Sequence, residues 1–208
     1  MGAGCNHGAE LPADRPEIRR ILLIVIAINA VMFVVEVAAS VQSGSLALLS
    51  DSLDFAGDAA TYGISLAVLS ASLRTRSWAA ILKAASMALF GIWILAAAVR
   101  AAIMGDVPDA TTMSAIGGLA LAANLISVLF LLRFRSGDAN LRSVWFCSRN
   151  DAINNVAVIL AGAGVFASAS RWPDLVVASI MALLAFWSAV SVLRQARHEL
   201  RHGAPGHA

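Results

Sequence analysis

The sequence has few charged side chains, and this shortage argues against a water-soluble domain. Only 13% of the 208 residues are Asp, Glu, Lys or Arg, whereas soluble domains average about 25%. Hydrophobic residues make up 59% of the chain and are spread over its whole length. A helix needs about 20 apolar residues to cross a bilayer, so six such helices with short loops use up nearly the entire chain. We therefore predict an all-α membrane protein with six transmembrane helices.

Features of enzymes and secreted proteins are also missing. The two cysteines, Cys5 and Cys147, fall in a predicted tail and a predicted helix, so a structural disulfide is not expected. Residues 1–20 lack the apolar core and small-residue site of a cleavable signal peptide. No nucleophile–base arrangement and no phosphate-binding loop is present. We therefore predict no enzyme, no ATP-driven pump, no cofactor and no nucleic-acid partner.

The apolar stretches define a membrane domain at residues 17–193, with a flexible tail at residues 1–16 and a short tail at residues 194–208. The predicted spans are residues 17–41, 46–72, 78–104, 112–132, 143–168 and 175–193. Twelve Lys and Arg residues fall on the side of the termini, and two fall on the other side. By the positive-inside rule both termini are cytoplasmic, and the protein lies in the inner (plasma) membrane. Cys5, His7 and the C-terminal histidines are interpreted as solvated tail residues or weak metal contacts.

The second predicted span carries three acids, Asp51, Asp54 and Asp58. Their spacing of i, i+3 and i+7 places all three on one face of a helix. An ionisable residue inside a membrane is costly and usually faces a bundle interior or a water-filled cavity. Three acids without matching cations favour a cation site over a water-bridged polar packing network. Asp51, one turn before Asp54, is interpreted as a supporting group or part of a proton path.

A second polar segment lies in the fifth predicted span, which runs antiparallel to the second. Asp54 and Asp58 form an i, i+4 pair, and Cys147 and Asp151 form another. Two such pairs on facing helices supply four ligands, which suits tetrahedral Zn²⁺ or Cd²⁺. Cys147 has an alternative interpretation as a small buried hydrophobic residue.

Other polar residues in the spans are candidates for completing or supporting this site. If the Cys147 thiol points away, Asn150, Asn155 or water complete the coordination shell. Asn124 and Glu36 are candidates for supporting the cavity through interhelical hydrogen bonds. For Glu36 we also consider a purely structural contact with a neighbouring helix, or a position near the outer interface.

Together the two polar segments resemble the cation diffusion facilitator family of divalent-metal/proton antiporters. The run Gly44 to Asp58 aligns without a gap with the family pattern Gly-Ser-x-Ala-x-Leu-x-Asp-Ala-x-His/Asp-x-x-x-Asp. The family's fifth-span pattern, His-x-x-x-Asp-Ala-x-x-x-Val, is matched at Asp151, Ala152 and Val156. The resemblance covers all six spans. It implies that Asp151 and the two later aspartates of the second span bind the transported ion.

The sequence departs from the family pattern in two places. Cys147 stands where the family usually has His, and a softer thiolate favours Cd²⁺ and Zn²⁺ over Mn²⁺ or Fe²⁺. The family usually carries a cytoplasmic metal-binding domain after the sixth span, whereas this sequence stops shortly after it. The resemblance therefore predicts a short form, with a homodimer formed through the membrane helices.

The predicted function is secondary active efflux of Zn²⁺ or Cd²⁺ from the cytoplasm in exchange for H⁺, by alternating access. The partners expected are divalent metal cations and membrane lipid, with the metal as a substrate. Two alternatives stay open: a proton-coupled transporter of a small organic cation, in which the acids are counter-charges, and a non-transporting membrane metal sensor.

Overall fold

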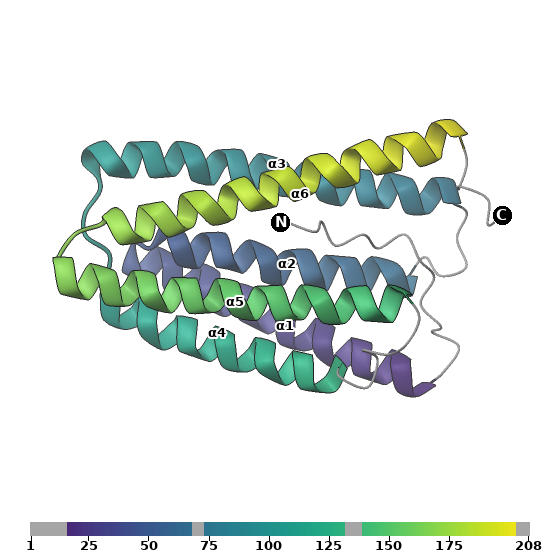
Figure 1. Cartoon of the computed structure of the whole chain (residues 1–208), viewed down its shortest axis with the longest axis horizontal. Coiled ribbons are helices and arrows are strands. Elements are labelled where there is room, and N and C mark those ends of the chain that lie inside the picture. Colours follow the sequence, from purple (N-terminus) through teal and green to yellow (C-terminus); the bar gives the residue numbers. More distant parts are fainter. Residues whose placement is uncertain (1–15, 68–72, 132–138, 203–208) are drawn as a thin grey trace.

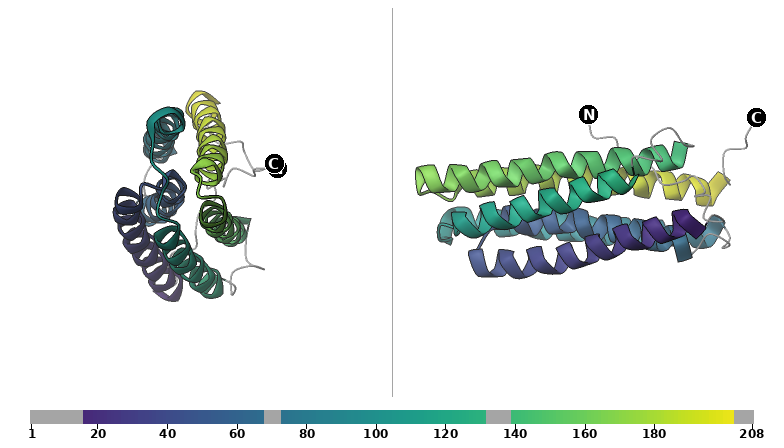
Figure 2. Two further views of the ribbon diagram at one scale, coloured as in Figure 1. Left: turned by 90° about the vertical axis from the view of Figure 1, so that its left-hand side faces the viewer. Right: turned by 90° about the horizontal axis from the view of Figure 1, so that it is seen from below.

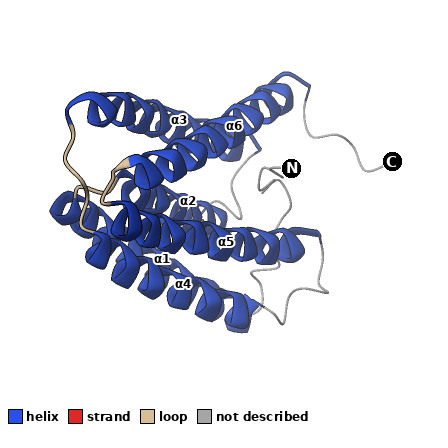
Figure 3. Cartoon of the chain, turned by 60° about the vertical axis from the view of Figure 1, so that its left-hand side comes forward, coloured by secondary structure: helices blue, strands red, loops and turns tan. Residues whose placement is uncertain are grey.

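The computed structural model describes residues 16–67, 73–131 and 139–202, which are helical apart from short turns and contain no β-strand. Six helices follow one another along the chain (Figures 1 and 3). They are α1 (Pro16–Ser43), α2 (Leu46–Ala67), α3 (Leu73–Met104), α4 (Ala110–Leu131), α5 (Ala139–Ser168) and α6 (Trp172–His202). The predicted all-α fold with six helices is confirmed.

Within the described ranges, five helices contain a stretch long and apolar enough to cross a membrane. The exception is α2, because its aspartates interrupt an otherwise apolar run of 22 residues. The spanning role of α2 therefore stays a prediction. The last helix also differs from its predicted bounds, since it continues to His202. No Gly or Pro interrupts the sequence between Leu193 and that residue, so nothing local ends the helix earlier.

Two groups of helices pack against each other (Figures 1 and 2). α3 and α6 lie side by side as a pair, whereas α1, α2, α4 and α5 form a four-helix group. α2 touches all the other helices of the bundle, so its side chains are central. Small residues allow the closest approaches. A Cβ on Gly91 of α3 would lie 3.2 Å from the carbonyl oxygen of Ala182 in α6, and one on Gly162 of α5 would lie 2.7 Å from Ser114 Oγ in α4.

The bundle has two distinct ends (Figure 1). The α1–α2, α3–α4 and α5–α6 connections share one end, which we call the loop end. The start of α1 and the end of α6 share the other, which we call the terminal end. The sequence predicts that the terminal end is cytoplasmic.

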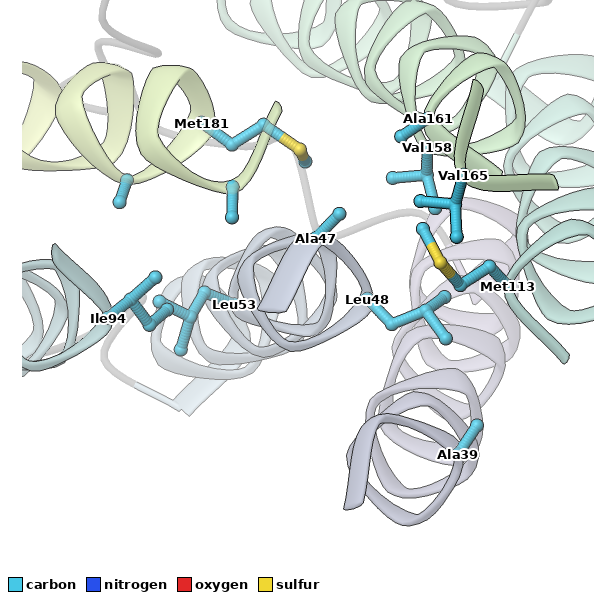
Figure 4. Packing of buried hydrophobic residues seen from close by; sticks show 12 residues of the cluster. Ala39, Ala47, Leu48, Leu53, Ile94, Met113, Val158, Ala161, Val165 and Met181 are labelled. Atoms are coloured by element: carbon cyan, nitrogen blue, oxygen red, sulfur yellow. The ribbon is translucent and has the colours of Figure 1, made fainter. Parts of the chain in front are cut away.

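An apolar layer fills the bundle near the loop end. It includes Leu48 of α2, Ile94 of α3, Met113 of α4, Val165 of α5 and Met181 of α6, all buried (Figure 4). Leu48 and Met113 lie in the first turns of α2 and α4, and Met181 lies in the third turn of α6. Ile94 and Val165 lie in the later turns of α3 and α5. The layer therefore lies on the loop-end side of Asp54 and Asp58.

Candidate functional site

The acids of α2 and α5 meet inside the four-helix group. Asp54 accepts a hydrogen bond through Oδ2 from Asn154 Nδ2 of α5, at 2.8 Å. The carboxyl group of Asp58, one turn further along α2, is a hydrogen-bonding neighbour of the Asp151 carboxyl on α5. Asp58 Oδ2 also accepts a hydrogen bond from the Tyr62 hydroxyl, at 2.9 Å. The structure thus brings together three of the four residues predicted to bind metal.

These acids do not surround a common point. Among the described residues, no three His, Cys, Asp or Glu side chains are arranged to hold one ion. Asp54 is engaged by Asn154, whereas Asp58 and Asp151 are engaged with each other. Asn154 engages Oδ2 of Asp54, so this carboxylate can keep its amide partner while its other oxygen faces an ion.

The fourth predicted ligand cannot be placed in the same way. Cys147 and Asn150 lie within helix α5, but their side chains are outside the described part of the chain. The thiol ligand, and the amide that would replace it, therefore stay predictions.

A lysine from α3 faces the same acids. The Lys83 side chain is half-buried, and its charge interacts with the carboxylates of Asp58 and Asp151. A cation beside two buried carboxylates offsets part of their repulsion. α3 therefore contributes a charge to the site, although it packs mainly against α6.

The structure places the predicted supporting residues on four helices, and the described ones are buried. Glu36 of α1 lies next to Asp51 of α2, and both side chains are buried. Asn155 is buried on α5 with neither amide atom hydrogen-bonded among the described residues. Asn124 is buried on α4.

Sequence reasoning missed two residues that position the acids. Asn154 lies three residues after Asp151, so the helical repeat would have placed the two on one face. Tyr62, the sole tyrosine of the sequence, lies four residues after Asp58. Both signals were present in the spacing.

A different buried acid fastens α6 to α2 at the loop end. Asp174, in the first turn of α6, accepts hydrogen bonds from the Ser45 hydroxyl at 2.6 Å, from Leu46 N at 3.0 Å and from Ala47 N at 3.0 Å. Ser45 Oγ in turn accepts a bond from Leu48 N at 3.1 Å. Asp174 and Ser45 thus cap the first turn of α2 together. We call this arrangement the clasp.

Other polar contacts join the helices at the loop end. Arg171 donates a hydrogen bond through Nη1 to the carbonyl oxygen of Ala101 in α3, at 2.6 Å. Asp109 N donates to the carbonyl oxygen of Ser43 at 2.9 Å, and the Asp109 carboxylate caps α4. Hydrogen bonds from Thr112 and Thr111 hold the pKa of this exposed carboxyl below its ordinary value. The connection before α2 turns at Gly44, whose φ of +72° suits a residue without a Cβ.

Comparisons with known proteins match most of the helical bundle to one family. The family model of the cation efflux transmembrane domain matches residues 22–200. The chain is 25% identical, over 222 aligned positions, to the metal cation efflux system protein CzcD of Cupriavidus metallidurans (strain CH34). It is equally similar to the cation efflux system protein CzcD of Alcaligenes sp. (strain CT14). Each alignment covers 99% of this chain and 67% of the relative.

Proposed function

The chain belongs to the cation efflux family, and from this premise we propose that it exports Zn²⁺ or Cd²⁺ from the cytoplasm in exchange for protons. The family match confirms the predicted resemblance to the cation diffusion facilitators. It also identifies the chain as a multi-pass transporter of the plasma membrane that carries metal cations as substrates. The metals, the counter-ion and the binding residues belong to the proposal.

The observation that carries the proposal is the meeting of carboxyl groups between α2 and α5. Asp58 and Asp151 touch across the helix interface, and Asp54 lies one turn away. Carboxylates in an apolar surrounding bind a cation because its charge removes their mutual repulsion. We propose that Asp54, Asp58 and Asp151 are ligands, with the Cys147 thiolate as the fourth.

Exchange with protons follows from the chemistry of these ligands. Carboxylates and thiols coordinate metal only when deprotonated, so binding of the ion releases protons. Asp58 and Asp151 are close enough to share a proton when no metal is bound. In the proposed cycle the ion displaces that proton on the cytoplasmic side, the bundle rocks to face outward, and returning protons release the ion.

Lys83 adds a constraint to this cycle. Its ammonium group interacts with Asp58 and Asp151, so it competes with the arriving ion for their charge. An internal cation of this kind keeps the empty site from holding several uncompensated acids. We propose that the side chain moves aside when the metal binds.

Orientation and assembly complete the proposal. The excess of Lys and Arg at the terminal end supports a cytoplasmic location for both termini. The predicted location in the plasma membrane is confirmed by the family match, whereas a homodimer formed through the membrane helices is retained as a proposal.

One experiment tests the transport site. Purified protein is reconstituted into liposomes, and uptake of Zn²⁺ and Cd²⁺ is driven by a pH gradient. We expect uptake by the native protein and none above background for Asp54→Ala and Asp151→Ala. Undiminished gradient-dependent uptake by both variants would overturn the ligand assignment.

The same assay separates the two alternatives. A transporter of small organic cations would be insensitive to Cys147→Ser, and Zn²⁺ would not compete with its substrate. A metal sensor would bind Zn²⁺ but move none.

A further inference from the structure

Glu36 and Asp51 form a buried acid pair that lies apart from the proposed metal ligands. Glu36 belongs to α1 and has no exposed surface, and Asp51 of α2 is 1% exposed. Their carboxyl groups are immediate neighbours. Both oxygens of Glu36, and Oδ2 of Asp51, have no hydrogen-bond partner among the described residues. Buried polar atoms normally have such a partner, so this pair calls for one from outside the chain.

No described cation faces the pair. The charged groups around Glu36 are Asp51 and Asp54 of α2, and α4, which also packs against α1, carries no charged residue. Asp51 is faced by Glu36, by Asp54 and by Asp151 of α5.

The other two neighbours of α2 add no cation to the pair. α3 directs Lys83 toward Asp58 and Asp151 instead. α6 contributes Asp174, whose carboxylate is engaged at the first turn of α2. Among the described side chains, the charged neighbours of the pair are therefore all acids.

Two adjacent carboxyl groups in this setting take up a proton. Ionisation of both would place two negative charges side by side inside the membrane without a counter-charge. A proton shared between them removes the repulsion and supplies a donor for the unpartnered oxygens. Binding of a transition metal is less suitable, because such ions take at least four ligands and only two acids are present.

The position of the pair suits a proton on its way through the bundle. Asp51 lies seven residues before Asp58 along α2, which corresponds to about 10 Å at ~1.5 Å per residue. The pair therefore lies between the proposed metal ligands and the loop end. Ser50 Oγ and both amide atoms of Asn155 are also buried and have no hydrogen-bond partner in the described part of the chain. These polar atoms are available to hydrogen-bond a passing proton carrier such as water.

Resting on the proposed metal/proton exchange, we propose that Glu36 and Asp51 form a second cation site, which binds the counter-transported proton separately from the metal ligands. When the bundle faces outward, the ionised member of the pair takes a proton from hydronium and releases water. When the next metal ion binds at Asp54, its charge one turn away drives that proton off toward the cytoplasmic side. One proton then crosses per metal ion through this pair, in addition to any released by the ligands.

The test separates metal binding from proton movement in the full-length chain. Liposomes contain a Zn²⁺ indicator and a pH indicator, and Zn²⁺ affinity is measured on the same purified protein by calorimetry. The variants are Glu36→Gln, Asp51→Asn as a second removal of the pair, and Glu36→Asp as the conservative change. Glu17→Gln, at an exposed position of α1, is the matched control.

We expect Glu36→Gln to keep Zn²⁺ affinity within a few-fold of native, while gradient-driven uptake falls about tenfold. The number of protons moved per Zn²⁺ should fall in both Glu36→Gln and Asp51→Asn, and Glu36→Asp should restore part of it. Glu17→Gln should match the native protein in every measurement.

Three results would overturn the inference. The first is a native proton-to-Zn²⁺ ratio in Glu36→Gln and Asp51→Asn. The second is a loss of Zn²⁺ affinity as large as that of Asp54→Ala, which would make Glu36 part of the metal site. The third is uptake driven by a Na⁺ gradient at constant pH and lost in Glu36→Gln, which would make the pair a sodium site. Failure of the native protein to move Zn²⁺ would instead overturn the proposed function itself.

Discussion

Asp174 and Glu36 are both buried acids, but they differ in their hydrogen-bond partners and in the charges of their neighbours. The Asp174 carboxylate accepts three hydrogen bonds from Ser45 and the first turn of α2. Both oxygens of Glu36 lack a hydrogen-bond partner among the described residues, and the neighbouring charges are acids. The first acid joins two helices, whereas the second has only acids as charged neighbours in the described part of the chain.

This difference in hydrogen bonding distinguishes an acid that stabilises the fold from an acid that serves ion or proton binding. A hydrogen-bonded carboxylate at a helix N-terminus lowers the free energy of the folded state. An unpartnered acid raises that free energy, so its presence requires another explanation, and ion or proton binding supplies one. The acids of α2 and α5 lie between these extremes, because Asn154, Tyr62 and Lys83 satisfy them in part.

The largest effect on stability is expected at the clasp. Asp174→Ala leaves the Ser45 hydroxyl and two backbone N–H groups of α2 without their acceptor, and loss of one partner from a buried charged network costs about 3–5 kcal/mol. Thermal unfolding in detergent micelles should show a clear drop in Tm. Ser45→Ala should cost less, about 1–2 kcal/mol, because one cap is lost. The assignment of the clasp fails if Asp174→Ala unfolds at the native temperature.

A smaller change in free energy is expected when Asn154, the hydrogen-bond partner of Asp54, is replaced. This change affects metal binding. Asn154→Leu removes the amide that orients this carboxylate, and loss of such a partner typically lowers metal affinity ~10–100-fold. Calorimetry with Zn²⁺ measures the change. The matched control is Asn29→Leu, because the Asn29 amide donates to the Val25 carbonyl of its own helix. Equal affinities of the two variants would remove Asn154 from the site.

Apolar substitution of the Glu36–Asp51 pair should raise the free energy of unfolding, whereas apolar substitution in the clasp should lower it. The double variant Glu36→Leu/Asp51→Leu replaces both carboxyl groups of the pair by apolar side chains, so we expect a gain of ~1–2 kcal/mol in the free energy of unfolding. Transport in liposomes should fall at the same time. Asp174→Leu, in the clasp, should instead lower Tm. A loss of stability in the double variant as large as in Asp174→Leu would show that the pair is structural.

The smallest effect is expected at the exposed cap of α4. Because hydrogen bonds from Thr112 and Thr111 lower the pKa of Asp109 below its ordinary value of 3.8, the cap stabilises the fold at higher pH. That contribution is complete above the ordinary pKa and is lost as the pH falls through the lowered one. The Tm difference between native protein and Asp109→Asn should therefore disappear in acid. A difference that grows toward low pH would contradict this sign.

Local patterns were sufficient to predict the helices and the acid face. Long apolar stretches predicted six helices, and the i, i+3, i+7 spacing predicted that Asp51, Asp54 and Asp58 share a face. The pairing of α2 with α5 followed from the motif resemblance, and the structure brings Asp58 to Asp151. Each of these features depends on neighbours within two helical turns or on a recognisable motif.

Local sequence patterns did not predict the contacts between segments that are far apart in the sequence. Asp174 and Ser45 are 129 residues apart in the sequence, and each alone looks like an ordinary first-turn residue. The direction of Lys83 depends on how α3 rotates against α2, which periodicity does not determine. The lack of partners around Glu36 depends on the packing of α2 and α4 against α1, so it became visible only in the folded bundle.

The central claim is that acids of α2 and α5 together bind the transported ion. It is tested most directly by equilibrium dialysis of Zn²⁺ against the native protein and the double variant Asp58→Asn/Asp151→Asn. We predict one membrane-embedded Zn²⁺ per native chain and none in the double variant. Native stoichiometry and affinity in the folded double variant would contradict the account.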